Sequence, residues 1–137
     1  MELLFAFATD DGDTLKDDGH FGNAEYYSIY RINSDKADFI EKRKNTKIEE
    51  DESKIHGDPN KAKSVSFVLK GINVLVSKRF GPNITRIIKK FSCVVIREGF
   101  LIKDVVKLVR ANLDSITAEY QKGEKRKPLI LTLGRGA

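Results

Sequence analysis

The sequence of 137 residues contains one cysteine, two histidines and no tryptophan. The single cysteine, Cys93, excludes an intramolecular disulfide framework, and it excludes a cysteine-rich zinc or iron-sulfur cage built by one chain. Cys93 begins the apolar run 93–96, and a free cysteine in such a run is typically a small core residue. We therefore expect an intracellular protein, and any metal that it binds would be held without a thiolate cage.

Long hydrophobic runs are also missing. The apolar run from Leu3 to Ala8 ends at Thr9, which makes it too short for a signal peptide or a membrane-spanning helix. We expect a soluble cytoplasmic protein without a membrane partner. The length, with 40% hydrophobic and 33% charged residues, is typical of one globular domain. We predict a single domain over residues 1–122, followed by a basic tail over residues 123–137.

Charge is distributed unevenly along the chain. The formal net charge is +5, but residues 1–60 have a net charge of −7 and residues 61–137 have a net charge of +12. Such asymmetry is typical of a protein with an anionic partner, including nucleic acid. It also arises when one domain has two oppositely charged faces. Both interpretations remain open at this point.

Hydrophobic patterning predicts an α/β domain with a mixed sheet flanked by helices. Three apolar runs indicate buried strands, at 2–9, 72–77 and 93–96. An aromatic segment and a more polar one indicate an antiparallel hairpin with an outer edge strand, at 26–33 and 37–44. Helices are expected at 59–70 with Asp58 as N-cap, at 84–91 and at 101–122. The short apolar run 129–133 predicts either a further strand or a surface that packs on a partner.

One segment stands out, the sequence His20-Phe21-Gly22-Asn23-Ala24 that follows a loop rich in Asp and Gly. Aromatic residues come next, and Gly81-Pro82 follows a later buried strand. In this order and separation, the combination resembles the dinitrogenase iron-molybdenum cofactor biosynthesis family over roughly residues 1–113. The basic tail from Tyr120 lies outside the resemblance.

The resemblance implies a ribonuclease-H-like sheet of five strands in the order 3-2-1-4-5. It also implies a nitrogenase-accessory-like carrier, which binds or helps to insert iron-molybdenum cofactor or another molybdenum or iron-sulfur cluster, with cluster-assembly proteins as partners. Many relatives lack nitrogenase, so the resemblance does not fix the cargo. This strand order places the loop after the first strand beside the loop after the fourth, at the edge where open α/β sheets bind ligands.

His20 is the best candidate for a metal ligand. An imidazole nitrogen coordinates transition metals, and the flanking Gly19 and Gly22 allow close approach of the backbone to a bulky cluster. The alternative is that His20 hydrogen-bonds to the backbone of its own loop. One imidazole cannot hold a cluster by itself, so further contacts are needed.

The further contacts are expected around a Gly-Pro turn. Molybdenum-sulfide clusters are anionic, and a helix that begins after Gly81-Pro82-Asn83 would direct amide groups and its positive end at them. The alternative is a simple turn with Asn83 as helix cap and solvated basic side chains. The predicted binding residues are His20, Phe21, Gly22, Asn23, Lys78, Arg79, Gly81, Pro82, Asn83 and Arg86, with His20 as the metal ligand and no catalytic residue.

Two other functions compete with a carrier. Asp10, Asp11 and Asp13 follow the first strand, as the magnesium-binding carboxylates of nucleases do, but the other strands offer no partner carboxylates, which favours an Asp-rich turn. We therefore do not expect an enzyme. A nucleic-acid-binding module that uses the basic half is the second hypothesis, and nucleic acid is the less favoured partner. A regulatory domain whose tail docks on a partner is the third. His56 is expected to be exposed.

Overall fold

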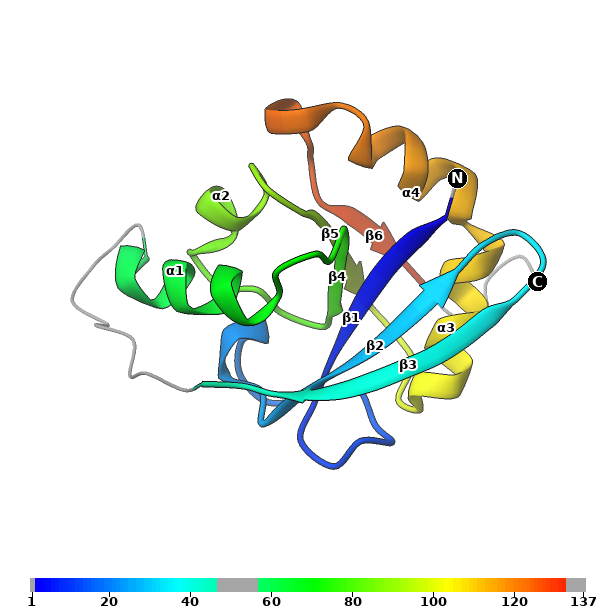
Figure 1. Cartoon of the computed structure of the whole chain (residues 1–137), viewed down its shortest axis with the longest axis horizontal. Helices are drawn as coiled ribbons and strands as arrows, with labels where there is room; N and C mark the ends of the chain where they lie inside the picture. Colours follow the sequence, from blue (N-terminus) through cyan, green and yellow to red (C-terminus); the bar gives the residue numbers. More distant parts are fainter. Residues whose placement is uncertain (1, 47–56, 133–137) are drawn as a thin grey trace.

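The structure is a computed structural model that describes residues 2–46 and 57–132. Its centre is a six-stranded mixed sheet in the order β3-β2-β1-β4-β5-β6 (Figure 1). The strands are β1 Leu3–Thr9, β2 Tyr26–Ile32, β3 Ala37–Lys44, β4 Val74–Ser77, β5 Ser92–Ile96 and β6 Leu129–Leu131. The helices are α1 Pro59–Val68, α2 Ile84–Ile87, α3 Ile102–Ala111 and α4 Leu113–Tyr120, with 3-10 turns η1 Phe21–Asn23 and η2 Gly123–Lys125.

Strand direction divides the sheet into two parts. β1, β2 and β3 pair in antiparallel fashion, and β1, β4, β5 and β6 are parallel to one another. The carboxyl ends of β1 and β4 therefore lie at the same edge of the sheet. The expected order 3-2-1-4-5 is confirmed, and β6 extends it by one strand that pairs with β5.

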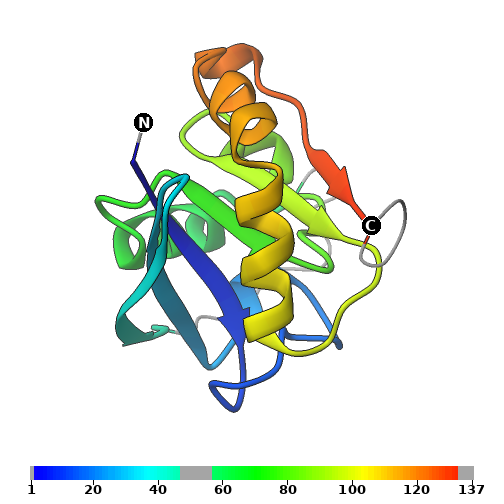
Figure 2. The ribbon, with the colours of Figure 1, turned by 90° about the vertical axis from the view of Figure 1, so that its right-hand side faces the viewer.

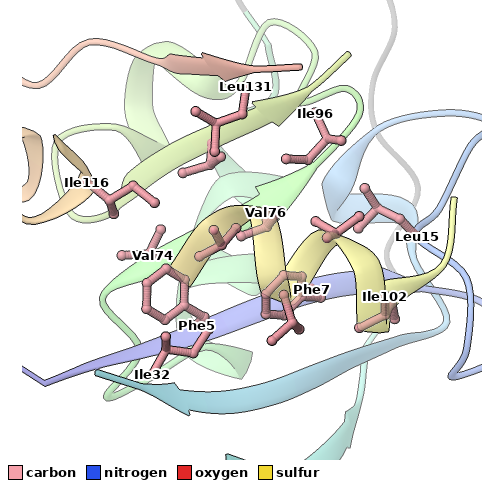
Figure 3. Packing of buried hydrophobic residues seen from close by; sticks show 14 of the residues in the cluster. Phe5, Phe7, Leu15, Ile32, Val74, Val76, Ile96, Ile102, Ile116 and Leu131 are labelled. Atoms are coloured by element: carbon pink, nitrogen blue, oxygen red, sulfur yellow. The ribbon is translucent and has the colours of Figure 1, made fainter. Parts of the chain in front are cut away.

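Both faces of the sheet are covered at β1, which explains the unbroken apolar sequence of that strand, whereas β3 at the edge is largely exposed. Phe5 and Phe7 point, together with Val74 and Val76, to the face that α3 and α4 cover, where they pack in one cluster with Ile116 of α4 (Figures 2 and 3). Residues of the opposite face pack under α1 and η1, and they include Ala6, Ala8, Tyr27, Leu75 and Cys93. Successive residues of a strand point to opposite faces, so a strand between two helical layers needs apolar residues at every position.

Two helices differ from the sequence expectation. The segment 101–122 is not one helix, because Asn112 separates α3 from α4 with φ −112° and ψ 20°. The side-chain amide of Asn112 donates to the carbonyl oxygen of Leu108 at 2.8 Å, and such local bonds compete with regular helix geometry. The helix predicted at 84–91 is also shorter, since α2 ends at Ile87.

The first helix agrees with the sequence expectation. Asp58 is its N-cap, and the Asp58 carboxylate accepts the amide hydrogen of Asn60 at 3.0 Å, while Pro59 takes the first helical position. Gly71 follows the helix with φ +88°, a conformation that favours glycine. Within residues 2–46 and 57–132, no helix is both long and apolar enough to cross a membrane.

Candidate functional site

Two loops meet at the carboxyl edge of β1 and β4. The amide of Phe21, in the loop after β1, donates to the carbonyl oxygen of Arg79, in the loop after β4, at 2.8 Å. The Phe21 ring, which is fully buried, stacks on Phe80 with 5.2 Å between ring centroids, and on Tyr27 with 4.7 Å. The hydroxyl of Tyr27 donates to the carbonyl oxygen of Phe21 at 2.9 Å. Phe21 therefore anchors one loop to the other.

This anchor places His20 directly against Gly81. Gly81 has φ +72°, and a Cβ atom built there would lie 2.6 Å from Cε1 and 2.7 Å from Cγ of the His20 ring. His20 is half-buried and makes no capping hydrogen bond to η1. Glycine is needed at position 81 both for the backbone angle and for the space that the imidazole occupies.

A small hollow lies beside His20. Its lining residues are His20, Gly22, Asn23, Lys61, Val65, Phe80, Asn83 and Ile87. Its volume is about 10 Å³, which is the room that one water molecule needs. A metal-sulfur cluster is much larger than this, so the hollow cannot enclose one. A bound cluster would have to lie on the surface above it.

Lys61 is a component of the hollow that the sequence analysis missed. This lysine belongs to the first turn of α1 and is only 4% exposed. A Cβ atom at Gly22 would lie 3.3 Å from Cε of Lys61 and 3.1 Å from Cγ2 of Val65, so Gly22 allows η1 to pack closely on α1. Lys61 lies four residues before Val65, on the buried face of the helix. The four-residue spacing between Lys61 and Val65 would have predicted from the sequence that Lys61 lies on the buried face.

Asn45 is a second residue that was missed. It follows β3, is 6% exposed, and its side-chain amide donates to the carbonyl oxygens of Gly22 and Ala24, both at 2.9 Å. These two bonds fix η1 from the side of the hairpin. No pattern around Asn45 in the sequence predicts this contact.

The remaining predicted residues do not all converge on the hollow. Lys78 forms an ion pair with Asp17 at 3.1 Å and lies over the ring of Phe100, with 6.0 Å between its Nζ atom and the centroid. Arg79 is exposed, and so is Pro82. The structure thus brings His20, Gly22, Asn23 and Asn83 together at the hollow, whereas Lys78 does not line it and pairs with Asp17, three residues before His20 in the same loop.

The Gly-Pro turn also differs from the expected anion site. Asn83 is 4% exposed and makes no capping hydrogen bond, and its side-chain oxygen accepts a hydrogen bond from Nη1 of Arg86 at 3.3 Å. α2 has four residues, and the amide of its first residue, Ile84, donates to the carbonyl oxygen of Gly81 at 3.2 Å. A single turn has little dipole. Any positive potential here comes from side chains.

Comparison with known families identifies the family of the chain. A family model described as dinitrogenase iron-molybdenum cofactor matches residues 1–112. The chain belongs to the dinitrogenase iron-molybdenum cofactor family. The matched residues include both loops, and they end at Asn112, so α4, η2 and β6 lie beyond them.

A solved structure shares the fold of this family member. It is a crystal structure from Methanocaldococcus jannaschii, described as a "putative dinitrogenase", with a TM-score of 0.54 and 17% sequence identity. The similarity covers 82% of this chain and 91% of the other. At this identity the similarity shows the fold alone. No curated protein matches the chain.

In this family member the acidic loop after β1 is a structural turn. The carboxylate of Asp11 accepts the amide hydrogens of Asp13 and Thr14, both at 2.8 Å, and these bonds lower the pKa of Asp11 to about 2. Asp10 pairs instead with Nζ of Lys16 at 2.8 Å. Among the described residues, no group of three or more His, Cys, Asp or Glu side chains could hold a metal ion.

The other residues considered as ligands lie elsewhere. Cys93 is 1% exposed in the core between the sheet and α1, and burial raises the pKa of its thiol to about 12. A protonated, enclosed thiol is not a metal ligand. The expectation of a core residue at Cys93 is therefore confirmed. His56 lies outside the described residues.

Proposed function

We propose that the chain is a noncatalytic carrier of an anionic iron-molybdenum cluster, or of a related molybdenum-sulfur cluster. The proposed binding surface lies over His20, at the junction of the two loops. The hydrogen bond from the Phe21 amide to the Arg79 carbonyl is the observation that supports it best, because it holds the most distinctive segment of the sequence against the Gly-Pro turn. Membership of the iron-molybdenum cofactor family supports the class of cargo.

The chemistry of the site suits a cargo held loosely. His20 supplies one imidazole nitrogen, and the exposed Arg79 and the half-buried Arg86 supply positive charge to attract an anion. At the protein surface each charge pair is worth only about 1 kcal/mol at 4 Å in water. One ligand and a few such charges permit release. Transfer to a cluster-assembly protein, or insertion into an acceptor, would therefore need no covalent step in this chain.

Anaerobic loading with tetrathiomolybdate tests the site. The protein is incubated with the anion and desalted, and retained molybdenum is measured by elemental analysis, with ultraviolet-visible spectra as a second readout. We expect the wild-type chain to retain molybdenum and His20→Ala to retain several-fold less, because the variant loses its only proposed metal ligand.

The other histidine provides the matched comparison. His56→Ala removes an imidazole from a segment outside the described residues, and it should retain the wild-type amount of molybdenum. Arg79→Gln should weaken retention at low salt more than at high salt, since exposed charges are screened. Retention that is absent in the wild type, or equal in the wild type and His20→Ala, would refute the proposed site.

A further inference from the structure

The outer edge of β6 is a second candidate surface, remote from His20 in the sequence and outside the family match. The family model ends at residue 112, whereas η2 and β6 lie between residues 123 and 131. β6 is the last strand of the sheet, and in the described part of the chain no strand pairs with its other side (Figure 2). The family match therefore does not include β6, the strand that forms this edge of the sheet.

The backbone of β6 offers hydrogen-bonding groups at this edge. The amide of Arg97 donates to the carbonyl oxygen of Leu131 at 2.9 Å, so that carbonyl points toward β5. Successive carbonyls of a strand point in opposite directions, and the carbonyl and amide of Ile130 therefore point outward. An unpaired row of this kind is a template for another strand.

The side chain of Ile130 adds an apolar contact. Ile130 is 52% exposed, while Leu131 is buried against the core under α3 and α4. Ile130 is in register with Val95 of β5, which is half-buried, so the two make an apolar patch beside the open edge. An apolar side chain on an added strand could pack against it.

Positive charge borders β6 at both ends. Four of the six residues from Lys122 to Lys127 are basic. Within that segment Lys122 pairs with Glu119 at 3.0 Å, and the backbone amide of Lys127 donates to the same carboxylate at 2.9 Å. Lys125 and Lys127 are exposed, and their side chains form no ion pair within 4 Å of described residues. At the other end Arg97, also exposed, is bonded through its amide to Leu131. The charge therefore suits an acidic partner.

We propose that the outer edge of β6 binds an extended, acidic segment of a partner protein, which adds a strand to the sheet. The outward backbone groups of Ile130 would pair with that strand, and Lys127 and Arg97 would contact acidic residues near its ends. A second copy of this chain fits less well, because its own β6 would bring the same positive charges.

Nucleic acid also fits less well than a peptide. Binding of single strands relies on exposed aromatic rings on which bases stack. The aromatic ring nearest in sequence, Tyr120, is only partly exposed, and the guanidinium of Arg126 lies over it at 4.6 Å from the centroid. Outward amide and carbonyl groups match a peptide backbone.

Fluorescence anisotropy with a labelled peptide, Glu-Glu-Val-Thr-Val-Glu-Glu, tests the proposal on the full chain. Ile130→Pro removes the outward amide but leaves the bond between Arg97 and Leu131, and proline is tolerated on edge strands. We expect it to weaken peptide binding about tenfold. Ile130→Thr keeps the amide and should weaken binding less. Amide exchange at Arg97 checks that β6 stays paired in both variants.

Reversing the charge of Lys127 and of the peptide ends tests the role of charge in binding. Lys127→Glu should weaken binding of the acidic peptide several-fold at low salt, and it should improve binding of a peptide with lysine at both ends. Lys63→Glu, on the exposed face of α1, is the matched control and should change neither.

Four outcomes would overturn the proposal. They are no peptide binding at low salt, unchanged binding in Ile130→Pro, equal effects of Lys63→Glu and Lys127→Glu, and tighter binding of a labelled thymidine oligonucleotide at the same edge. A dimer that forms without peptide and is lost in Ile130→Pro would instead assign the edge to self-association. None of these outcomes depends on retention of molybdenum by the His20 loop.

Discussion

Gly81 lies directly against His20, because the imidazole occupies the space that a side chain at position 81 would need. Gly81→Ala should destabilise the fold by about 2 kcal/mol, since alanine is strained at φ +72° and its Cβ atom would collide with the ring. Urea unfolding measures the change.

Gly71→Ala is the matched control for this substitution. Gly71 has φ +88°, but a Cβ atom there would meet nothing within 4 Å. Gly71→Ala introduces the backbone strain without the collision, so it should lower the free energy of unfolding by about 1 kcal/mol. Equal losses of stability in the two variants would show that the ring of His20 moves away without cost when position 81 gains a Cβ atom.

Asp11 makes stability depend on pH in the acidic range. Hydrogen bonds from the amides of Thr14 and Asp13 lower the pKa of Asp11 to about 2 from an ordinary value of 3.8. A lowered pKa means that the charged form stabilises the turn, so this contribution is complete above about pH 4 and is lost as the pH falls toward 2. Asp11→Asn should flatten the pH dependence in that window, as measured by urea unfolding at several pH values.

The carboxyl chemical shift of Asp11 provides a direct check. Titration followed by nuclear magnetic resonance should give a midpoint for Asp11 well below the ordinary value of 3.8. A midpoint for Asp11 near 3.8 would contradict the prediction, because it would mean that the amide bonds are not maintained in solution.

At the residue level, sequence reasoning proposed His20 and Phe21 but did not predict the residues that hold their loop in place. His20 and Phe21 were recognisable because the motif is local. Lys61 and Asn45 reach the same loop from α1 and from the end of β3, and such contacts depend on how distant elements pack. Lys78 was grouped with the site because it is near in sequence, yet it pairs with Asp17 instead.

At the level of elements, the side chain of Arg126 connects the segment before β6 to the end of α4 and to the segment after α2. Its Nε atom donates to the carbonyl oxygen of Tyr120 at 2.8 Å, and Nη1 donates to that of Lys89 at 3.1 Å and to that of Ile88 at 3.3 Å. Only a guanidinium reaches several carbonyls at once in this way, so lysine is not an equivalent replacement.

We therefore expect Arg126→Lys to loosen β6. The variant should lose about 1 to 2 kcal/mol of stability and show faster amide exchange at Arg97, whose amide is bonded to β6. Lys125→Ala, one residue earlier and exposed, should change neither quantity. Unchanged exchange at Arg97 in Arg126→Lys would mean that β6 is held by its own pairing with β5.

Element boundaries show where sequence patterns lose information. The apolar stripe from residue 102 to residue 120 continues across Asn112, so periodicity alone predicted one helix, although the side chain of Asn112 breaks the backbone there. α1 was predicted well because its signals, Asp58, Pro59 and Gly71, are local. β6 has three residues, too few for a pattern to decide between a strand and a partner contact.

At the scale of the whole molecule, the strand order came from the family resemblance, because composition and periodicity do not determine which strands are neighbours. The positive charge of the second half of the sequence is divided between two places in the fold. Arg79 and Arg86 lie in the loop and helix that follow β4, near His20, while the segment from Lys122 to Lys127 precedes β6. These groups belong to opposite ends of parallel strands. We therefore expect the basic half of the sequence to contribute to both proposed surfaces.

Because Cys93 is buried, the reactivity of its thiol reports opening of the core. It is the only thiol, it is enclosed between the sheet and α1, and its raised pKa keeps it protonated at neutral pH. A thiol reagent can modify it only in molecules whose core has opened around β5. The modification rate thus records how often the centre of the domain opens, and a ligand bound at either edge of the sheet should slow that rate without touching the cysteine.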